Sequence, residues 1–134
     1  MIFLKAILIW LSITPLAILN GALRDFITVP YLGYDIAMPL SGIILSVLIF
    51  IVSYLLIPKI GKQKAATFIV IGAIWFVLTN LFDLLFVVIE NRPVSDFFAM
   101  FDITTGNLWC LVIIVCFTAP ILVAKARKLI VSIK

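Results

Sequence analysis

Histidine is absent from this 134-residue sequence, cysteine occurs twice, and acidic residues occur six times. Without histidine, the chain has no imidazole to ligate a metal or to transfer protons in catalysis. Cys110 and Cys116 lie on different faces of one predicted helix, too far apart along its axis for a disulfide or a shared metal. The sequence also has no phosphate-binding glycine loop and no nucleophile elbow. We therefore expect no metal and no other cofactor.

Charge is also scarce. Charged residues make up 12% of the chain and hydrophobic residues 66%, with a mean hydropathy of +1.37. In soluble domains about a quarter of the residues are charged, so a chain this apolar needs a lipid solvent. One bilayer crossing takes roughly 20 residues. The length therefore suits four crossings with short loops and excludes a large soluble catalytic domain.

Four apolar runs predict an all-α, integral membrane four-helix bundle that forms a single domain. Prolines and glycines between residues 26 and 39 predict a loop at the membrane surface after the first run. Aromatic residues in the segment 96–101 suit a short interfacial helix. The predicted spans cover about residues 2–23, 40–57, 65–89 and 108–124.

The first run has an alternative interpretation, because Lys5 followed by apolar residues also resembles the start of a secretory signal peptide. The apolar core of such a peptide has roughly 7–15 residues. The run from Ile2 to Leu23 is longer, so we expect a retained membrane span.

The distribution of basic residues predicts the orientation of the chain. Only Arg24 and Arg92 fall on one side of the predicted bundle, and the remaining Lys and Arg residues fall on the other. Positive charge favours the cytoplasmic side, so we expect both termini there and the acidic residues toward the outer side. Because the cations lie in short loops beside apolar runs, the net charge of +4 indicates topology and not nucleic-acid binding.

Asp83 is the most informative residue, because it lies well inside the third predicted span. A charge at the centre of a membrane helix costs roughly 2.5–3.5 kcal/mol on insertion scales, so this carboxylate should have a partner. Helical periodicity places Gly72, Thr79, Asp83 and Glu90 on one face, with Asn80 at its edge. We expect this face to point into the bundle.

Arg24 is the predicted partner of Asp83, because it lies at a comparable depth in the first span. Asn20, Thr79 and Asn80 would then satisfy the remaining hydrogen-bonding groups. Such a cluster can be a structural clasp that fixes helix register, or a site for a ligand, an ion or a proton. Asp83 could carry a proton only if Arg24 is not tightly paired with it.

Several short motifs resemble a family of small bacterial inner-membrane proteins with four predicted spans and no assigned activity. They are Asn20-Gly21-Ala22-Leu23-Arg24-Asp25, Pro39-Leu40-Ser41-Gly42, Trp75 with Thr79 and Phe82-Asp83, and Asp102 followed by Gly106-Asn107-Leu108-Trp109. The family pattern has Glu at the positions of Asp25 and Asp83 and Arg at that of Asn107. The resemblance implies a multi-pass protein of the bacterial inner membrane and adds Asn107 to the candidate residues. Asp25 and Asp102 are candidates because they add more polar groups beside Asp83 than a clasp needs.

Three functions are compatible with the sequence. The first is binding or transport of a small polar solute, an ion or a lipid headgroup in an outer-facing polar cluster, with a homo-oligomer forming any pathway. The second is a non-catalytic accessory or scaffold subunit that works with a partner membrane protein. The third, a lipid-modifying enzyme using paired acids, has the least support because histidine and a nucleophile motif are missing. The candidate ligand-binding residues are Asn20, Arg24, Asp25, Thr79, Asn80, Asp83, Asp102 and Asn107.

Overall fold

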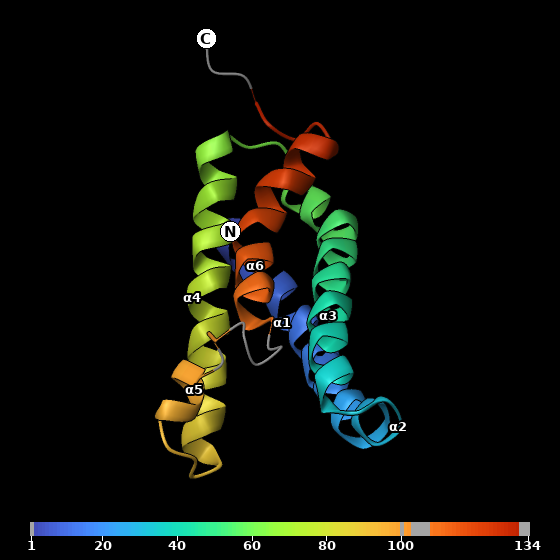
Figure 1. Cartoon of the computed structure of the whole chain (residues 1–134). Coiled ribbons are helices and arrows are strands. Elements are labelled where there is room, and N and C mark those ends of the chain that lie inside the picture. Colours follow the sequence, from blue (N-terminus) through green and yellow to red (C-terminus); the bar gives the residue numbers. More distant parts are fainter. Residues whose placement is uncertain (1, 100, 103–107, 132–134) are drawn as a thin grey trace.

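The computed structural model describes residues 2–99, 101–102 and 108–131 and is all-α, apart from one isolated backbone bridge (Figure 1). In this part of the chain, four helical segments are long and apolar enough to cross a membrane. They confirm the predicted all-α bundle of four long apolar helices. The segments are Ile2–Leu32, Tyr34–Ile60, Ala65–Ile89 and Trp109–Ala126.

The first two long helices are joined by a much tighter turn than the sequence suggested. Helix α1 (Ile2–Leu23) continues through the π-helical turn η1 (Arg24–Thr28) into α2 (Val29–Leu32), and α3 (Tyr34–Leu56) begins after Gly33. Gly33 has φ +86° and makes the reversal by itself. The loop predicted for residues 26–39 is therefore mostly helical, because prolines are tolerated in membrane helices.

The other connections are also short. A 3-10 turn, η2 (Ile57–Ile60), ends α3, and Gly61 with φ +90° turns the chain toward α4 (Ala65–Ile89). Helix α5 (Ser95–Ala99) follows α4, and its Phe97 ring packs edge-to-face on Phe98 and Phe101. Its position at the membrane interface stays a prediction.

Helix α6 (Trp109–Ala126) is the centre of the packing. It contacts α4 most extensively and α3 next, while α1 packs mainly on α3 and lies behind α6 in Figure 1. The α4–α6 crossing is close at Gly72, where an added Cβ would lie 2.0 Å from the carbonyl oxygen of Phe117. Trp75, Phe68 and Ile71 of α4 are fully buried in the resulting core.

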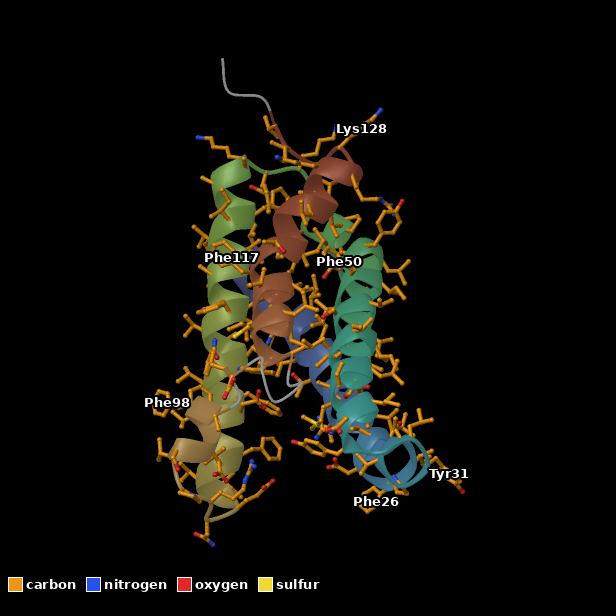
Figure 2. All side chains as sticks on the ribbon, in the orientation of Figure 1. Phe26, Tyr31, Phe50, Phe98, Phe117 and Lys128 are labelled. Carbon is orange, nitrogen blue, oxygen red and sulfur yellow. The ribbon has the colours of Figure 1, made fainter. Side chains whose placement is uncertain are left out.

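One end of the bundle gathers basic segments that are distant in sequence. The Nζ of Lys5 donates to the carbonyl oxygen of Lys59 at 3.4 Å, which joins the first turns of α1 to the end of η2. Beside them, the backbone N–H of Gln63 donates to the carbonyl of Leu129 at 3.0 Å. Lys128 lies at this end and Phe26 and Tyr31 at the opposite one (Figure 2). That the basic end faces the cytoplasm stays a prediction.

Candidate functional site

Asp83 and Asn80 present buried polar atoms that the protein does not satisfy. They lie one turn apart on α4, and both side chains are half-buried. Asp83 Oδ2 and Asn80 Oδ1 are inaccessible to solvent and have no hydrogen-bond partner in the described part of the chain. Asn80 uses its amide nitrogen to donate to the Phe76 carbonyl at 2.9 Å. An ionised Asp83 carboxylate and the Asn80 amide oxygen are both acceptors, so a donor from a ligand would satisfy them.

The predicted pair between Arg24 and Asp83 is wrong. Arg24 Nε contacts Asp25 Oδ1 at 3.0 Å, and within the described residues no ion pair joins Arg24 to Asp83. Arg24 is the first residue of the π turn, whose wider winding changes the direction of side chains relative to a regular α-helix. The adjacent carboxylate of Asp25 is also available without any helix–helix contact. Sequence periodicity, which assumes a regular helix, could not show this.

Arg92 does not neutralise Asp83 either. Its Nε contacts Glu90 Oε2 at 2.9 Å, in a pair with side chains about half exposed. Each arginine has its own carboxylate, and Asp83 is left without a contacting cation among the described residues.

Asn20 was predicted to support an Arg24–Asp83 pair, but its role is different. Its Nδ2 lies 3.0 Å from both the carbonyl oxygen and the Oγ of Ser41. Asn20 is 8% exposed and Ser41 is 6% exposed. The two residues therefore form a buried polar link between α1 and α3.

Thr79 is also occupied by helix–helix contacts. Its Oγ1 accepts a hydrogen bond from Trp10 Nε1 at 2.9 Å and donates to the Trp75 carbonyl at 2.7 Å. Cys116 Sγ of α6 lies 3.7 Å from the same hydroxyl. Thr79 thus joins three helices. Helical periodicity predicted that Thr79 points into the bundle but did not identify Trp10 as its partner.

The remaining candidates lie around this centre. Asp25 is exposed and paired with Arg24, and Asp102 is an exposed residue just after α5. Asn107 lies outside the described residues. The structure thus keeps Asp83, Asn80 and Thr79 together on α4 and gives Asn20 and Arg24 other partners.

An apolar pocket of about 490 Å³ lies beside Asn80. It is formed between α4 and the α5 segment. The aromatic residues of that segment were predicted to lie at the lipid headgroups. The sequence could not show this pocket, because the pocket depends on how the α5 segment packs against α4. Its lining residues are Phe76, Val77, Asn80, Phe97, Phe98 and Phe101.

Asp83 Oδ2 and Asn80 Oδ1 can accept hydrogen bonds or a positive charge, whereas the neighbouring pocket is apolar and is not lined by Asp83. Cation binding over aromatic faces and at carboxylates is a general mode of recognition. Over the described ranges, no group of three or more Cys, Asp or Glu side chains could hold a metal ion.

No family model, curated protein or solved structure matches this chain. The resemblance drawn from its short motifs therefore stays a prediction.

Proposed function

We propose that this protein is a membrane-embedded binding protein for a small polar solute or ion, which it holds at Asp83 and Asn80. The observation that carries the proposal is the buried Oδ2 of Asp83, which has no hydrogen-bond partner among residues 2–99, 101–102 and 108–131. An unsatisfied polar group in a lipid interior costs several kcal/mol. A ligand that supplies a donor or a positive charge would offset that cost.

The chemistry of the surroundings favours a donor or a cation over an anion. Asn80 adds a second buried acceptor oxygen one turn away. An anion would meet these two acceptors, at which no donor side chain of the described residues is directed.

The membrane context follows from the sequence. We propose a bacterial inner-membrane location. We also propose that both termini lie in the cytoplasm, because most Lys and Arg residues lie on the same side of the four predicted spans as the termini. Asp83 then lies in the outer half of the membrane. Transport across the bilayer would require this short chain to form a homo-oligomer or to join a partner membrane protein.

Asp83→Asn tests this proposal, because the substitution should change stability differently if Asp83 is a ligand site than if it is part of a structural clasp. If Asp83 is reserved for a ligand, removing its charge should raise the unfolding free energy of the ligand-free protein, or leave it within about 0.5 kcal/mol. If Asp83 belongs to a paired clasp, the substitution should cost about 3–5 kcal/mol. Unfolding of the purified full chain in detergent micelles distinguishes these outcomes.

Binding is measured with the same variant. We expect Na⁺, guanidinium or choline to raise the melting temperature of the wild type and to have no such effect on Asp83→Asn. Asp96→Asn is the matched control, since it removes one carboxylate from the short helix α5 and leaves Asp83 and Asn80 unchanged. A response to the cations that survives in Asp83→Asn would contradict the proposal.

A second candidate function is a non-catalytic accessory subunit. It is favoured by the use of Asn20 and Thr79 in helix–helix hydrogen bonds, which leaves fewer polar groups for a ligand. A large loss of stability in Asp83→Asn, with no response to the probe cations in the wild type, would support this function.

A further inference from the structure

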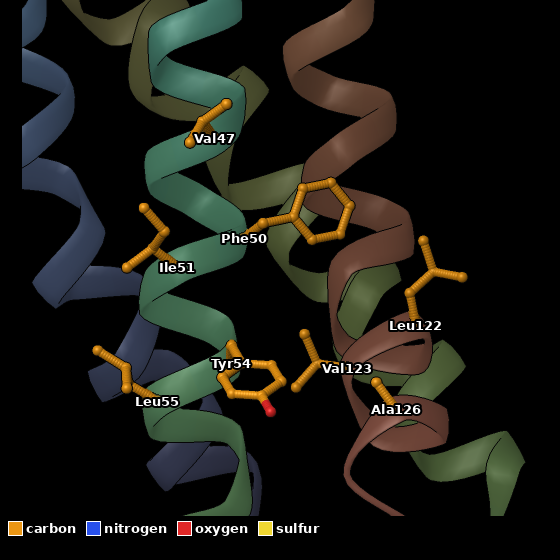
Figure 3. Close-up of a pocket in the computed structure, with 8 residues that line it drawn as sticks. All are labelled: Val47, Phe50, Ile51, Tyr54, Leu55, Leu122, Val123 and Ala126. Atoms are coloured by element: carbon orange, nitrogen blue, oxygen red, sulfur yellow. The ribbon is translucent and has the colours of Figure 1, made fainter.

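A second cavity lies between α3 and α6, on the side of the bundle that faces away from its core and toward the end opposite Asp83. It is a groove of about 500 Å³, within the range of roughly 300–1,000 Å³ that is usual for ligand sites. Figure 3 shows side chains from both helices directed toward the space between them. The groove is lined by Val47, Phe50, Ile51, Tyr54, Leu55, Leu122, Val123 and Ala126.

The walls of this groove are hydrocarbon, except at one end. Tyr54 and Ala126 form that end, which lies next to the final turn of α6. The Cζ of Arg127 lies 4.6 Å from the centre of the Tyr54 ring, and its Nη1 donates to the Tyr54 carbonyl at 3.5 Å. A guanidinium held in this way keeps its other N–H donors available to a ligand.

The end of the bundle at which the groove terminates is basic. Lys125, Arg127 and Lys128 are exposed in and just after the last turn of α6, and Arg127 contacts the groove residue Tyr54. The sequence has no acidic residue between Asp35 and Asp83 and none after Asp102. Therefore α3 after Asp35, α6 and the connection from α3 to α4 contain no acidic side chain that could neutralise these cations.

We propose that this groove binds one anionic phospholipid, with an acyl chain between α3 and α6 and the phosphate on Arg127. Apolar walls suit an acyl chain, and arginine pairs with phosphate through two parallel hydrogen bonds. Basic pockets between membrane helices are known to hold anionic headgroups. The phenol of Tyr54 has the amphipathic character that suits the boundary between chain and headgroup.

The basic end also distinguishes lipid from a second copy of this chain. Two copies joined through this face would bring the same cations together, which is unfavourable. An anionic lipid instead neutralises them. This inference does not depend on the function proposed for Asp83, because the two sites share no residue.

Native mass spectrometry of the full chain in detergent tests the inference. The protein is titrated with phosphatidylglycerol and, separately, with phosphatidylcholine that has the same acyl chains. We expect the wild type to retain phosphatidylglycerol several-fold more strongly. Arg127→Gln should weaken phosphatidylglycerol binding about fivefold and leave phosphatidylcholine unchanged. Lys62→Gln is the charge-matched control, because Lys62 lies at the same end but does not line the groove.

The apolar part of the site needs its own variant. Ala126→Trp should fill the end of the groove and reduce binding of both lipids, whereas Ile114→Trp, on an exposed α6 position outside the lining, should not. A melting temperature close to that of the wild type shows that each variant folds.

Three results would overturn the inference. One is equal retention of the two lipids by the wild type. Another is an equal loss of phosphatidylglycerol binding in Arg127→Gln and Lys62→Gln, which would indicate diffuse attraction of the lipid to a basic surface. The third is unchanged lipid binding in Ala126→Trp.

Discussion

The indole nitrogen of Trp10 donates a hydrogen bond to Thr79 Oγ1 at 2.9 Å, and the indole of Trp75 donates in return to the Ala6 carbonyl at 3.0 Å. The first bond runs from α1 to α4 and the second from α4 to α1. Backbone contacts between these two helices are otherwise sparse. The two tryptophans therefore link helices that lie apart for most of their length.

Thr79→Val should destabilise the protein, because valine keeps the shape of threonine but cannot accept the Trp10 hydrogen bond. A buried donor left without a partner costs about 1–3 kcal/mol. Unfolding in detergent micelles measures the loss. Thr118→Val is the matched control, since Thr118 bonds only to the Ile114 carbonyl of its own helix. Equal effects of the two substitutions would show that the link between α1 and α4 adds nothing.

Gly72→Ala should destabilise the α4–α6 crossing, because the new methyl group would lie 2.0 Å from a backbone oxygen of Phe117. The Phe117 backbone cannot move aside as a flexible side chain can, so we expect the unfolding free energy to fall by about 1–3 kcal/mol. Gly21→Ala is the control, because its methyl group would meet only Arg24 Nη2 at 3.8 Å. Unfolding measurements on both variants should separate close packing from the general effect of removing a glycine.

The fold was largely predictable from the sequence, because four long apolar runs have few alternatives in a bilayer. The predicted loop at residues 26–39 was too long. Proline and glycine mark turns in water, but in lipid the chain must satisfy its backbone groups, and helix continues through Pro30 and Pro39. Gly33 alone makes the reversal.

The site was predictable only in part. Helical periodicity predicted that Thr79, Asp83 and Glu90 face the bundle, and Thr79 does contact α1 and α6, but Glu90 is exposed and pairs with Arg92. Periodicity could not identify partners on other helices, because these depend on helix rotation and on the π turn at Arg24. The expected Arg24–Asp83 pair failed for this reason. The same physical premise, that a buried acid needs a partner, now draws attention to Asp83, whose Oδ2 has none in the part of the chain that the structure describes.

Asn20 and Ser41 should show an energetic coupling if their hydrogen bond helps to join α1 to α3. Polar contacts between membrane helices contribute about 0.6 kcal/mol on average and up to about 1.7 kcal/mol. The double-mutant cycle uses Asn20→Ala, Ser41→Ala and the combined variant. We expect a coupling in this range, and strictly additive losses would indicate that Asn20 acts through the Ser41 backbone carbonyl alone.

Arg24→Gln should have little effect on stability, in contrast to what an Arg24–Asp83 pair would require. Arg24 contacts Asp25, whose side chain is 61% exposed, and exposed ion pairs contribute about 0–1 kcal/mol. A buried pair that lost one partner would instead cost about 3–5 kcal/mol. Unfolding of Arg24→Gln and Asp25→Asn in detergent should give losses below about 1 kcal/mol for both. A large loss for Arg24→Gln, with none for Asp25→Asn, would mean that Arg24 neutralises Asp83 after all, and Asp83 would then no longer be available as a ligand site.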